Sequence, residues 1–140
     1  MEPFIFLEHT ADAKFQAFGK SLEEAFSNAL KAMFYIIHED LKDIKKCKKK
    51  AISLKAATRE ALLYDFLSEA LFYLDTEHLI LPFTDEITIN KINNQYELKA
   101  VLTGDKVSHY KTHGDIKAVT YNEMQIKKNQ RWMVQVVVDI

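Results

Sequence analysis

The sequence contains few of the residues that mark several classes of protein. Its 140 residues include three glycines, two prolines and one cysteine. So few glycines and prolines exclude a collagen-like chain and a long low-complexity linker. The single cysteine excludes an internal disulfide. No apolar run approaches the roughly 20 residues that a membrane-spanning helix needs, and the first residues carry no basic segment typical of a secretory signal, so we expect a cytoplasmic protein with no membrane partner.

The chain also has no excess of positive charge. Nineteen Lys and Arg residues are balanced by twenty Asp and Glu residues, which gives a formal net charge of −1. A protein whose main partner is bare nucleic acid usually carries a basic excess, so the charge balance disfavours that class. Hydrophobic residues make up 48% of the chain, which is ordinary for a globular protein. The length predicts a single domain over residues 1–140.

Hydrophobic periodicity predicts an α+β fold. One helix is expected to begin after Ser21, where Glu24 completes a capping box, and a second after Thr58. Apolar residues at helical spacing follow over 22–33 and 63–74. Alternating or continuous apolar residues predict strands over 4–9, 13–18, 52–56, 79–83, 87–92, 96–102, 116–126 and 132–138. This order predicts two helices packed on a largely antiparallel sheet.

The sequence lacks the common signatures of a self-contained enzyme. Its glycines, Gly19, Gly104 and Gly114, are isolated and form no phosphate-binding loop. No nucleophile elbow is present. Cys47 has no histidine close to it in the sequence, and we expect it to have no catalytic role.

Two further patterns have both a functional and a structural interpretation. Five lysines occur within residues 45–50, where they could contact phosphate or form a solvated sheet edge that resists pairing with another strand. Because the chain as a whole is not basic, we favour the sheet edge. His109 and His113 would share one face of a helix and could bind zinc. Their segment has no helical pattern and no cysteine partner, so we do not expect a zinc site.

Acidic residues occur at the edge of a predicted strand and at the C-terminus. Asp12 follows the break at residues 9–11, and Asp139 and Ile140 follow a strongly apolar strand. If these segments meet, two side-chain carboxylates and the α-carboxylate would repel one another unless a positive group intervened. A hard divalent cation with oxygen ligands is one solution. From the residues alone we favour the alternative, in which Asp12 caps a turn and the C-terminus is solvated.

Four segments together resemble the archease family. They are residues 9–12 with Gly19 and the helix start at 21–26, the second helix over 62–74, the segment 116–121 and the ending 136–140. The resemblance covers the whole chain in order. The sequence departs from the family pattern at Phe66, Ser68, Asp115 and Asn122, and these departures leave the acidic residues untouched.

The resemblance implies a fold and a function. The implied fold is a two-layer α+β sandwich with a distant likeness to a heat-shock chaperone domain. The implied function is that of a protein factor and not of an enzyme. Archeases activate the GTP-dependent tRNA-splicing ligase, which joins RNA 2′,3′-cyclic or 3′-phosphate ends to 5′-hydroxyl ends. Such a factor promotes guanylylation of the ligase and repeated turnover, and RNA is then contacted only indirectly, through the ligase.

The resemblance also implies specific site residues. Asp12, Asp139 and the C-terminal Ile140 correspond to a divalent-metal site, with Ca²⁺ expected in vitro and Mg²⁺ or Mn²⁺ as alternatives. Lys117 corresponds to a residue needed, with the two aspartates, to activate the partner, and His9 is placed behind the metal ligands. Two rival functions stay open: a chaperone-like modulator of tRNA-modifying methyltransferases, and a metal-dependent hydrolase that uses Asp12 and His9.

Overall fold

The computed structural model describes residues 2–140, which form seven strands, two α-helices and two short 3₁₀ helices. In chain order the elements are β1 (Phe4–Leu7), β2 (Asp12–Gly19), α1 (Leu22–Tyr35), η1 (Leu41–Asp43), β3 (Lys48–Ala56), α2 (Arg59–Glu77), β4 (Leu79–Ile92), β5 (Gln95–Lys106), η2 (Val107–His109), β6 (Ala118–Lys128) and β7 (Trp132–Asp139).

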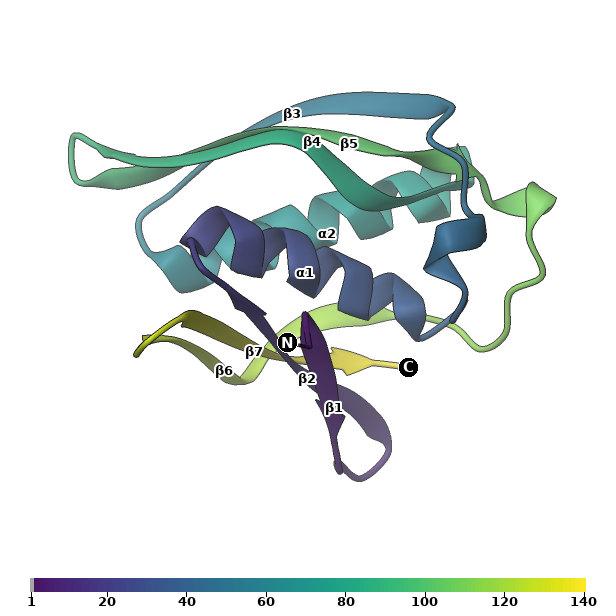
Figure 1. Ribbon diagram of the computed structural model, residues 1–140, viewed down its shortest axis with the longest axis horizontal. Coiled ribbons are helices and arrows are strands. Elements are labelled where there is room, and N and C mark those ends of the chain that lie inside the picture. Colours follow the sequence, from purple (N-terminus) through teal and green to yellow (C-terminus); the bar gives the residue numbers. More distant parts are fainter. Residues whose placement is uncertain (1) are drawn as a thin grey trace.

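The strands form two antiparallel sheets with both helices between them (Figure 1). One sheet has the strand order β1-β2-β7-β6 and the other has the order β3-β5-β4. The predicted α+β class, with two helices packed on antiparallel strands, is therefore confirmed. The sequence pattern did not separate the strands into two sheets, because strand alternation gives the buried face of a strand but not its neighbour.

Both predicted helix starts are present. The Ser21 hydroxyl accepts a hydrogen bond from the Glu24 backbone N–H at 3.1 Å, and the Glu24 carboxylate accepts one from the Lys20 backbone N–H at 2.9 Å. The Thr58 hydroxyl accepts one from the Ala61 backbone N–H at 3.0 Å. These bonds satisfy N–H groups that have no partner within the helix, so each helix begins where its cap stands.

The core fills the space between the two sheets. The rings of Phe26 on α1 and Phe66 on α2 are both fully buried, with centroids 5.7 Å apart. Phe15 on β2 and Leu98 on β5 bury their side chains against the helices from opposite sheets. The helices are thus enclosed, and the positions of the strand ends follow from this packing. Neither helix within residues 2–140 has the length and apolar character that crossing a bilayer requires.

Several predicted strand boundaries differ from the structure. The strand expected over 52–56 begins at Lys48, and the strand expected over 96–102 continues to Lys106. The expected strands over 79–83 and 87–92 are one strand, β4, whose pairing with β5 is irregular between Ile80 and Phe83 and again between Asp85 and Thr88. Strand β6 begins at Ala118 and carries a bulge between Thr120 and Gln125. Bulges leave residues unpaired within a strand and interrupt the alternation that sequence patterns rely on.

Candidate functional site

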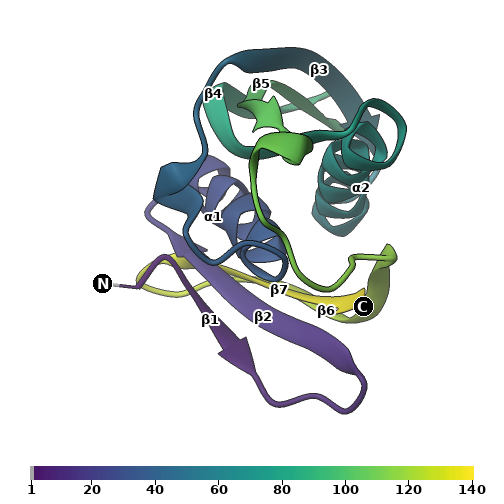
Figure 2. The same cartoon turned by 90° about the vertical axis from the view of Figure 1, so that its right-hand side faces the viewer.

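The strand register brings the predicted acidic residues together. Asp12 is the first residue of β2 and lies directly opposite Asp139, the last residue of β7. On the other side of β7, Asp139 lies opposite Ala118, the first residue of β6. Figure 2 shows the C-terminus close to the start of β6. We call Asp12, Asp139 and the terminal Ile140 the acidic end of the four-stranded sheet.

The two aspartates share the outer face of this sheet. Successive side chains of a strand point to opposite faces, and Val138 belongs to the core between the sheets. Asp139 therefore points outward, and Asp12, its direct partner, points the same way. Side chains paired in this manner have Cβ atoms about 4.5–5.5 Å apart, and like charges at that separation destabilise a sheet. A cation bound between the two carboxylates would relieve this repulsion.

Lys117 is held against the acidic end by its backbone. Its N–H donates a hydrogen bond to the Asp139 carbonyl at 2.8 Å. Its side chain is exposed and, in the part of the chain that the structure describes, has no ion-pair partner. Within the described residues no ion pair joins Lys117 to Asp115, two positions earlier, and the ammonium group is available to a partner.

His9 lies behind Asp12, held by a residue that the sequence analysis did not select. The Nε2 atom of His9 is 2.8 Å from a carboxylate oxygen of Glu123, and Lys14 donates to the other oxygen at 3.0 Å. The Nδ1 atom of His9 is 3.7 Å from the Asp12 carboxylate. Hydrogen bonds from Lys14 and then His9 lower the pKa of Glu123, so this carboxyl is held in its charged form. Glu123 thus ties the segment before Asp12 to β6.

Two non-glycine residues in the left-handed backbone region lie beside the acidic end. Ala11, which directly precedes Asp12, has φ 65°, and Glu123 in the β6 bulge has φ 53°. Residues other than glycine rarely adopt this conformation, and strain of this kind persists only where surrounding contacts enforce it. For Glu123 those contacts include a hydrogen bond from the Gln135 side chain to its carbonyl at 2.8 Å. No sequence signal marks a left-handed glutamate, which is why Glu123 was missed.

The donor groups at the acidic end fit a hard cation. Within residues 2–140 no three His, Cys, Asp or Glu side chains are grouped closely enough to hold a metal ion. A cation here would therefore need the α-carboxylate of Ile140 beside the Asp12 and Asp139 side chains, as the resemblance implies. An all-carboxylate set suits Ca²⁺, Mg²⁺ or Mn²⁺ better than Zn²⁺. The buried Nδ1 atom of His9, which has no hydrogen-bond partner, faces Asp12 from behind.

The two loop histidines are held by different acidic residues. His109 lies 3.2 Å from the Asp105 carboxylate, and His113 lies 3.9 Å from Glu39. They do not share a helix face, because only residues 107–109 of this segment are helical. The geometry of the two histidines thus gives no support to a zinc site.

Asp105 is a buried carboxylate that the sequence did not single out. It accepts hydrogen bonds from the Tyr110 hydroxyl at 2.7 Å and from the Lys106 backbone N–H at 2.8 Å, and it faces His109. The Tyr110 bond, followed by the His109 contact, lowers the pKa of Asp105 from 3.8 to about 2. The Tyr110 hydroxyl in turn accepts from the Lys45 backbone N–H, so Asp105 fixes the start of the lysine-rich segment.

Fold and site together define a small α+β domain that presents charged groups at open strand ends. Residues 4–140 match the model of the Archease protein family (MTH1598/TM1083). The protein archease of Methanosarcina barkeri is 41% identical over 138 residues, covering 96% of this chain and 94% of that protein. The protein archease of Pyrococcus abyssi is 38% identical, with 95% of each chain covered.

Solved structures agree with these relatives. The solution structure of Methanobacterium thermoautotrophicum protein 1598 is similar over 100% of both chains, with a TM-score of 0.85 and 30% identity. The Thermotoga maritima structure described as an archease and possible chaperone has a TM-score of 0.63 and 21% identity, covers 96% of this chain and 94% of that one, and supports the fold. The chain belongs to the archease family, as its motifs indicate.

Proposed function

We propose that this protein activates the GTP-dependent tRNA-splicing RNA ligase, by promoting guanylylation of the ligase and repeated turnover. Membership of the archease family supports a role as an activator or chaperone-like protein. The observation that carries the proposal is the pairing of Asp12 with Asp139 across β2 and β7, with Lys117 bonded to the same strand end. The residues expected to activate the partner thus lie on one surface.

The acidic end is suited to contact a partner because it lies at the edge of the fold. Ile140 is 44% exposed and the Asp12 side chain 29% exposed, so both are accessible without unfolding. The backbone of Asp139 is fixed between two neighbouring strands, which limits the entropy lost when a partner binds. The side chains of Asp12 and Asp139 would hold a divalent cation with the Ile140 α-carboxylate. Such a cation, when bound, supplies positive charge that neutralises and orders nucleotide phosphates.

Lys117 has a separate role in this proposal. Its unpaired, exposed ammonium group would bind an acidic side chain or a phosphate of the ligase complex. Its backbone bond to the Asp139 carbonyl fixes where that charge is presented. We therefore expect loss of Lys117 to reduce activation without changing cation affinity, whereas loss of either aspartate should reduce both.

The experiment measures transfer of radiolabelled GTP to the cognate ligase, with and without this protein. We expect substoichiometric amounts to raise guanylylation and to convert a single round of ligation into repeated turnover. Alone, the protein should neither ligate RNA nor hydrolyse GTP. The variants Asp12→Ala, Asp139→Ala and Lys117→Ala should fold and lose most of the activation.

The matched controls carry the same substitutions at exposed positions of other strands and helices. Asp75→Ala on α2 and Lys127→Ala on β6 should activate as the unmodified protein does. Equal guanylylation and turnover in the presence and absence of the protein, across Mg²⁺, Mn²⁺ and Ca²⁺, would refute the proposal. Protection of a tRNA methyltransferase from aggregation would then become the function to test.

A further inference from the structure

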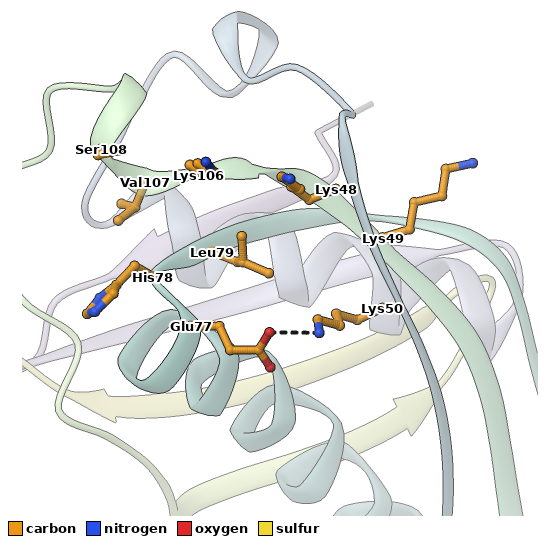
Figure 3. A pocket seen from close by; sticks show the side chains of 9 residues that line it. All are labelled: Lys48, Lys49, Lys50, Glu77, His78, Leu79, Lys106, Val107 and Ser108. Carbon is orange, nitrogen blue, oxygen red and sulfur yellow. Dashed lines mark ion pairs between the residues drawn. The ribbon is translucent and has the colours of Figure 1, made fainter.

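A lysine-lined hollow of about 720 Å³ opens on the other sheet (Figure 3). It lies where β3 begins, where α2 passes into β4, and where β5 ends. We call it the basic cleft. Its lining residues are Lys48, Lys49, Lys50, Glu77, His78, Leu79, Lys106, Val107 and Ser108.

Three of these lysines continue the core-facing side of the sheet beyond the end of helix α2. Leu102 faces the core on β5, and Lys50 lies directly opposite it on β3. By the alternation of the strands, Lys48 and Lys106 share that face. Helix α2 ends at Glu77, so it does not cover this part of the sheet. Lys49, one residue out of phase, points away from the cleft in Figure 3.

Protection of a sheet edge does not explain this arrangement. Strand β3 is an edge strand, and lysines on it agree with the expectation that the run blocks pairing. Lys106, however, is on β5, the central strand of the sheet, which has no free edge to protect. Lys50 is held by Glu77 at 2.7 Å, while in the described residues Lys48 and Lys106 have no ion-pair partner. Two unpaired ammonium groups therefore line the same hollow.

Aromatic rings continue from the basic cleft onto α2. The Lys50 ammonium lies 5.4 Å from the centroid of the Tyr73 ring, and Phe72 packs edge-on against Tyr73 with centroids 5.7 Å apart. Phe72 is 53% exposed, so its ring is accessible to a ligand. An exposed ring on the helix that ends at a positive groove is a combination on which unpaired bases stack while their phosphates are neutralised.

A second hollow of about 490 Å³ lies beside the basic cleft and shares Lys48 and Lys106 as lining residues. Lys45 lines this second hollow, together with the acidic residues Asp43 and Asp105. Asp105 keeps its negative charge, but hydrogen bonds from Tyr110 and the backbone already engage its carboxylate. Lysines that line two neighbouring hollows suit a chain of phosphates better than a single anion.

We propose that the basic cleft binds single-stranded nucleic acid directly, with phosphates on Lys48 and Lys106 and a base on Phe72. This differs from the expectation that RNA is reached only through a partner. An acidic protein segment would also be attracted to the lysines, but its acidic side chains would not stack on the exposed ring. The chain has a net charge of −1, but several of its lysines are clustered at the cleft. A positive site can therefore exist although the net charge does not indicate one.

The test measures binding of a fluorescent single-stranded oligouridine by the isolated protein, with affinity recorded against salt concentration. Each phosphate contact on a single strand contributes about −0.7 to the slope of log affinity against log salt. Two contacts, from Lys48 and Lys106, predict that affinity falls about sevenfold between roughly 50 and 200 mM salt. The double variant Lys48→Gln/Lys106→Gln should bind more weakly and lose little further affinity over that range.

Two matched controls separate a local site from general charge and from folding. Lys55→Gln/Lys99→Gln removes two exposed lysines from the same sheet outside the cleft and should keep the original salt slope. Phe72→Ala should weaken binding about tenfold with no change in slope. Ile92→Ala, which removes another exposed apolar side chain, should have no effect.

Three results would overturn the proposal. The first is no binding at low salt, and the second is an equal loss of affinity in both lysine double variants. The third is an oligoglutamate that competes as well as the oligonucleotide and whose binding is not weakened by Phe72→Ala. The last result would make the basic cleft a docking site for an acidic protein. Because the assay contains no ligase, its outcome is independent of the proposed activation, which could fail while the oligonucleotide still binds, or the reverse.

Discussion

The acidic end and the basic cleft belong to different sheets, yet both lie toward the end of the molecule that faces the viewer in Figure 2. Backbone pairing builds the acidic end, since Asp12 and Asp139 are opposed because β2 and β7 are in register. Long flexible side chains build the basic cleft. Lys50 pairs with Glu77 and Lys49 with Asp85, whereas Lys48 and Lys106 have no ion-pair partner among the described residues. The first site therefore has fixed geometry, whereas the second has a fixed charge but a variable shape.

This difference suggests what each site can recognise. Short carboxylates on adjacent strands suit a small ion with a demanding coordination sphere. Lysines on strand ends are mobile point charges, which suits a polymer whose phosphates bind in more than one arrangement. Substitutions should accordingly be more damaging at the acidic end than in the basic cleft. The four predictions below test this contrast in order of expected size.

The largest effect is expected for Asp139→Asn, and its sign should depend on the cation. In chelator the variant should be more stable than the unmodified protein by about 0.5 kcal/mol, because one of two opposed like charges is removed. With Ca²⁺ at about 100 times its Kd, the unmodified protein should gain about 2.7 kcal/mol and the variant much less. Thermal unfolding with and without Ca²⁺ measures both. The cation would lie elsewhere if Ca²⁺ stabilised the variant as much as the unmodified protein. It would also lie elsewhere if the exposed control Asp85→Asn lost the stabilisation by Ca²⁺.

Glu123→Gln should weaken Ca²⁺ binding about tenfold, although Glu123 is not one of the expected ligands. The substitution releases His9 and with it the segment that precedes Asp12. Stability should change by less than about 1 kcal/mol, because the Glu123 side chain is 45% exposed and its ion pairs are screened. Calorimetric titration is the measurement. Glu86→Gln is the matched control, since Glu86 is also exposed and left-handed, with φ 48°. Equal Ca²⁺ affinity in the two variants would remove Glu123 from the site.

Asp105→Asn tests the support beneath the basic cleft through pH. The pKa of Asp105 is lowered in the folded chain from 3.8 to about 2, chiefly by the Tyr110 hydroxyl. The stability supplied by the charged form is therefore complete above pH 3.8 and lost as the pH falls toward 2. The variant should unfold several degrees lower at neutral pH, and the difference should shrink through that acid range. A difference in Tm that stays constant below pH 3.8 would contradict this role, whereas Ca²⁺ binding at neutral pH should be unaffected.

The smallest effect is expected for Lys48→Arg/Lys106→Arg. Both charges are retained, so oligonucleotide affinity should stay within about twofold and the salt slope should not change. Fluorescence binding in parallel with the Gln double variant measures this. A loss as large as that caused by Gln would show that the cleft selects the shape of the ammonium group, and the contrast with the acidic end would fail.

Local chemistry made much of the fold predictable from sequence. Ser21 and Thr58 begin the helices because each hydroxyl satisfies an N–H a few residues away in the chain. The strands of β2, β5 and β7 were recognisable from alternation, since their buried faces need apolar side chains at every second position. Even the expected break before β2 is present, at the left-handed Ala11.

The two sites are formed by residues that are far apart in the sequence. Local sequence patterns do not predict which of these residues pair with one another. That Asp12 meets Asp139 was implied by the family resemblance, whereas the residues alone favoured a turn capped by Asp12 and a solvated C-terminus. Glu123 could not be predicted, because no residue pattern in the sequence marks the bulge that turns this glutamate toward His9. Lys106 was overlooked because it is separated in sequence from the lysines of 45–50 and joins Lys48 only when β3 pairs with β5.

The strand order of the four-stranded sheet has a consequence for synthesis on the ribosome. Strand β7 is the last to be made, yet it lies between β2 and β6 and completes the pairing of both. Until it emerges, β2 and β6 have no common neighbour, and the hairpin of β1 and β2 presents an open edge. A nascent chain without β7 therefore cannot bring Asp12 and Asp139 together, and any partner that recognises this pair binds only chains in which β7 has paired with β2.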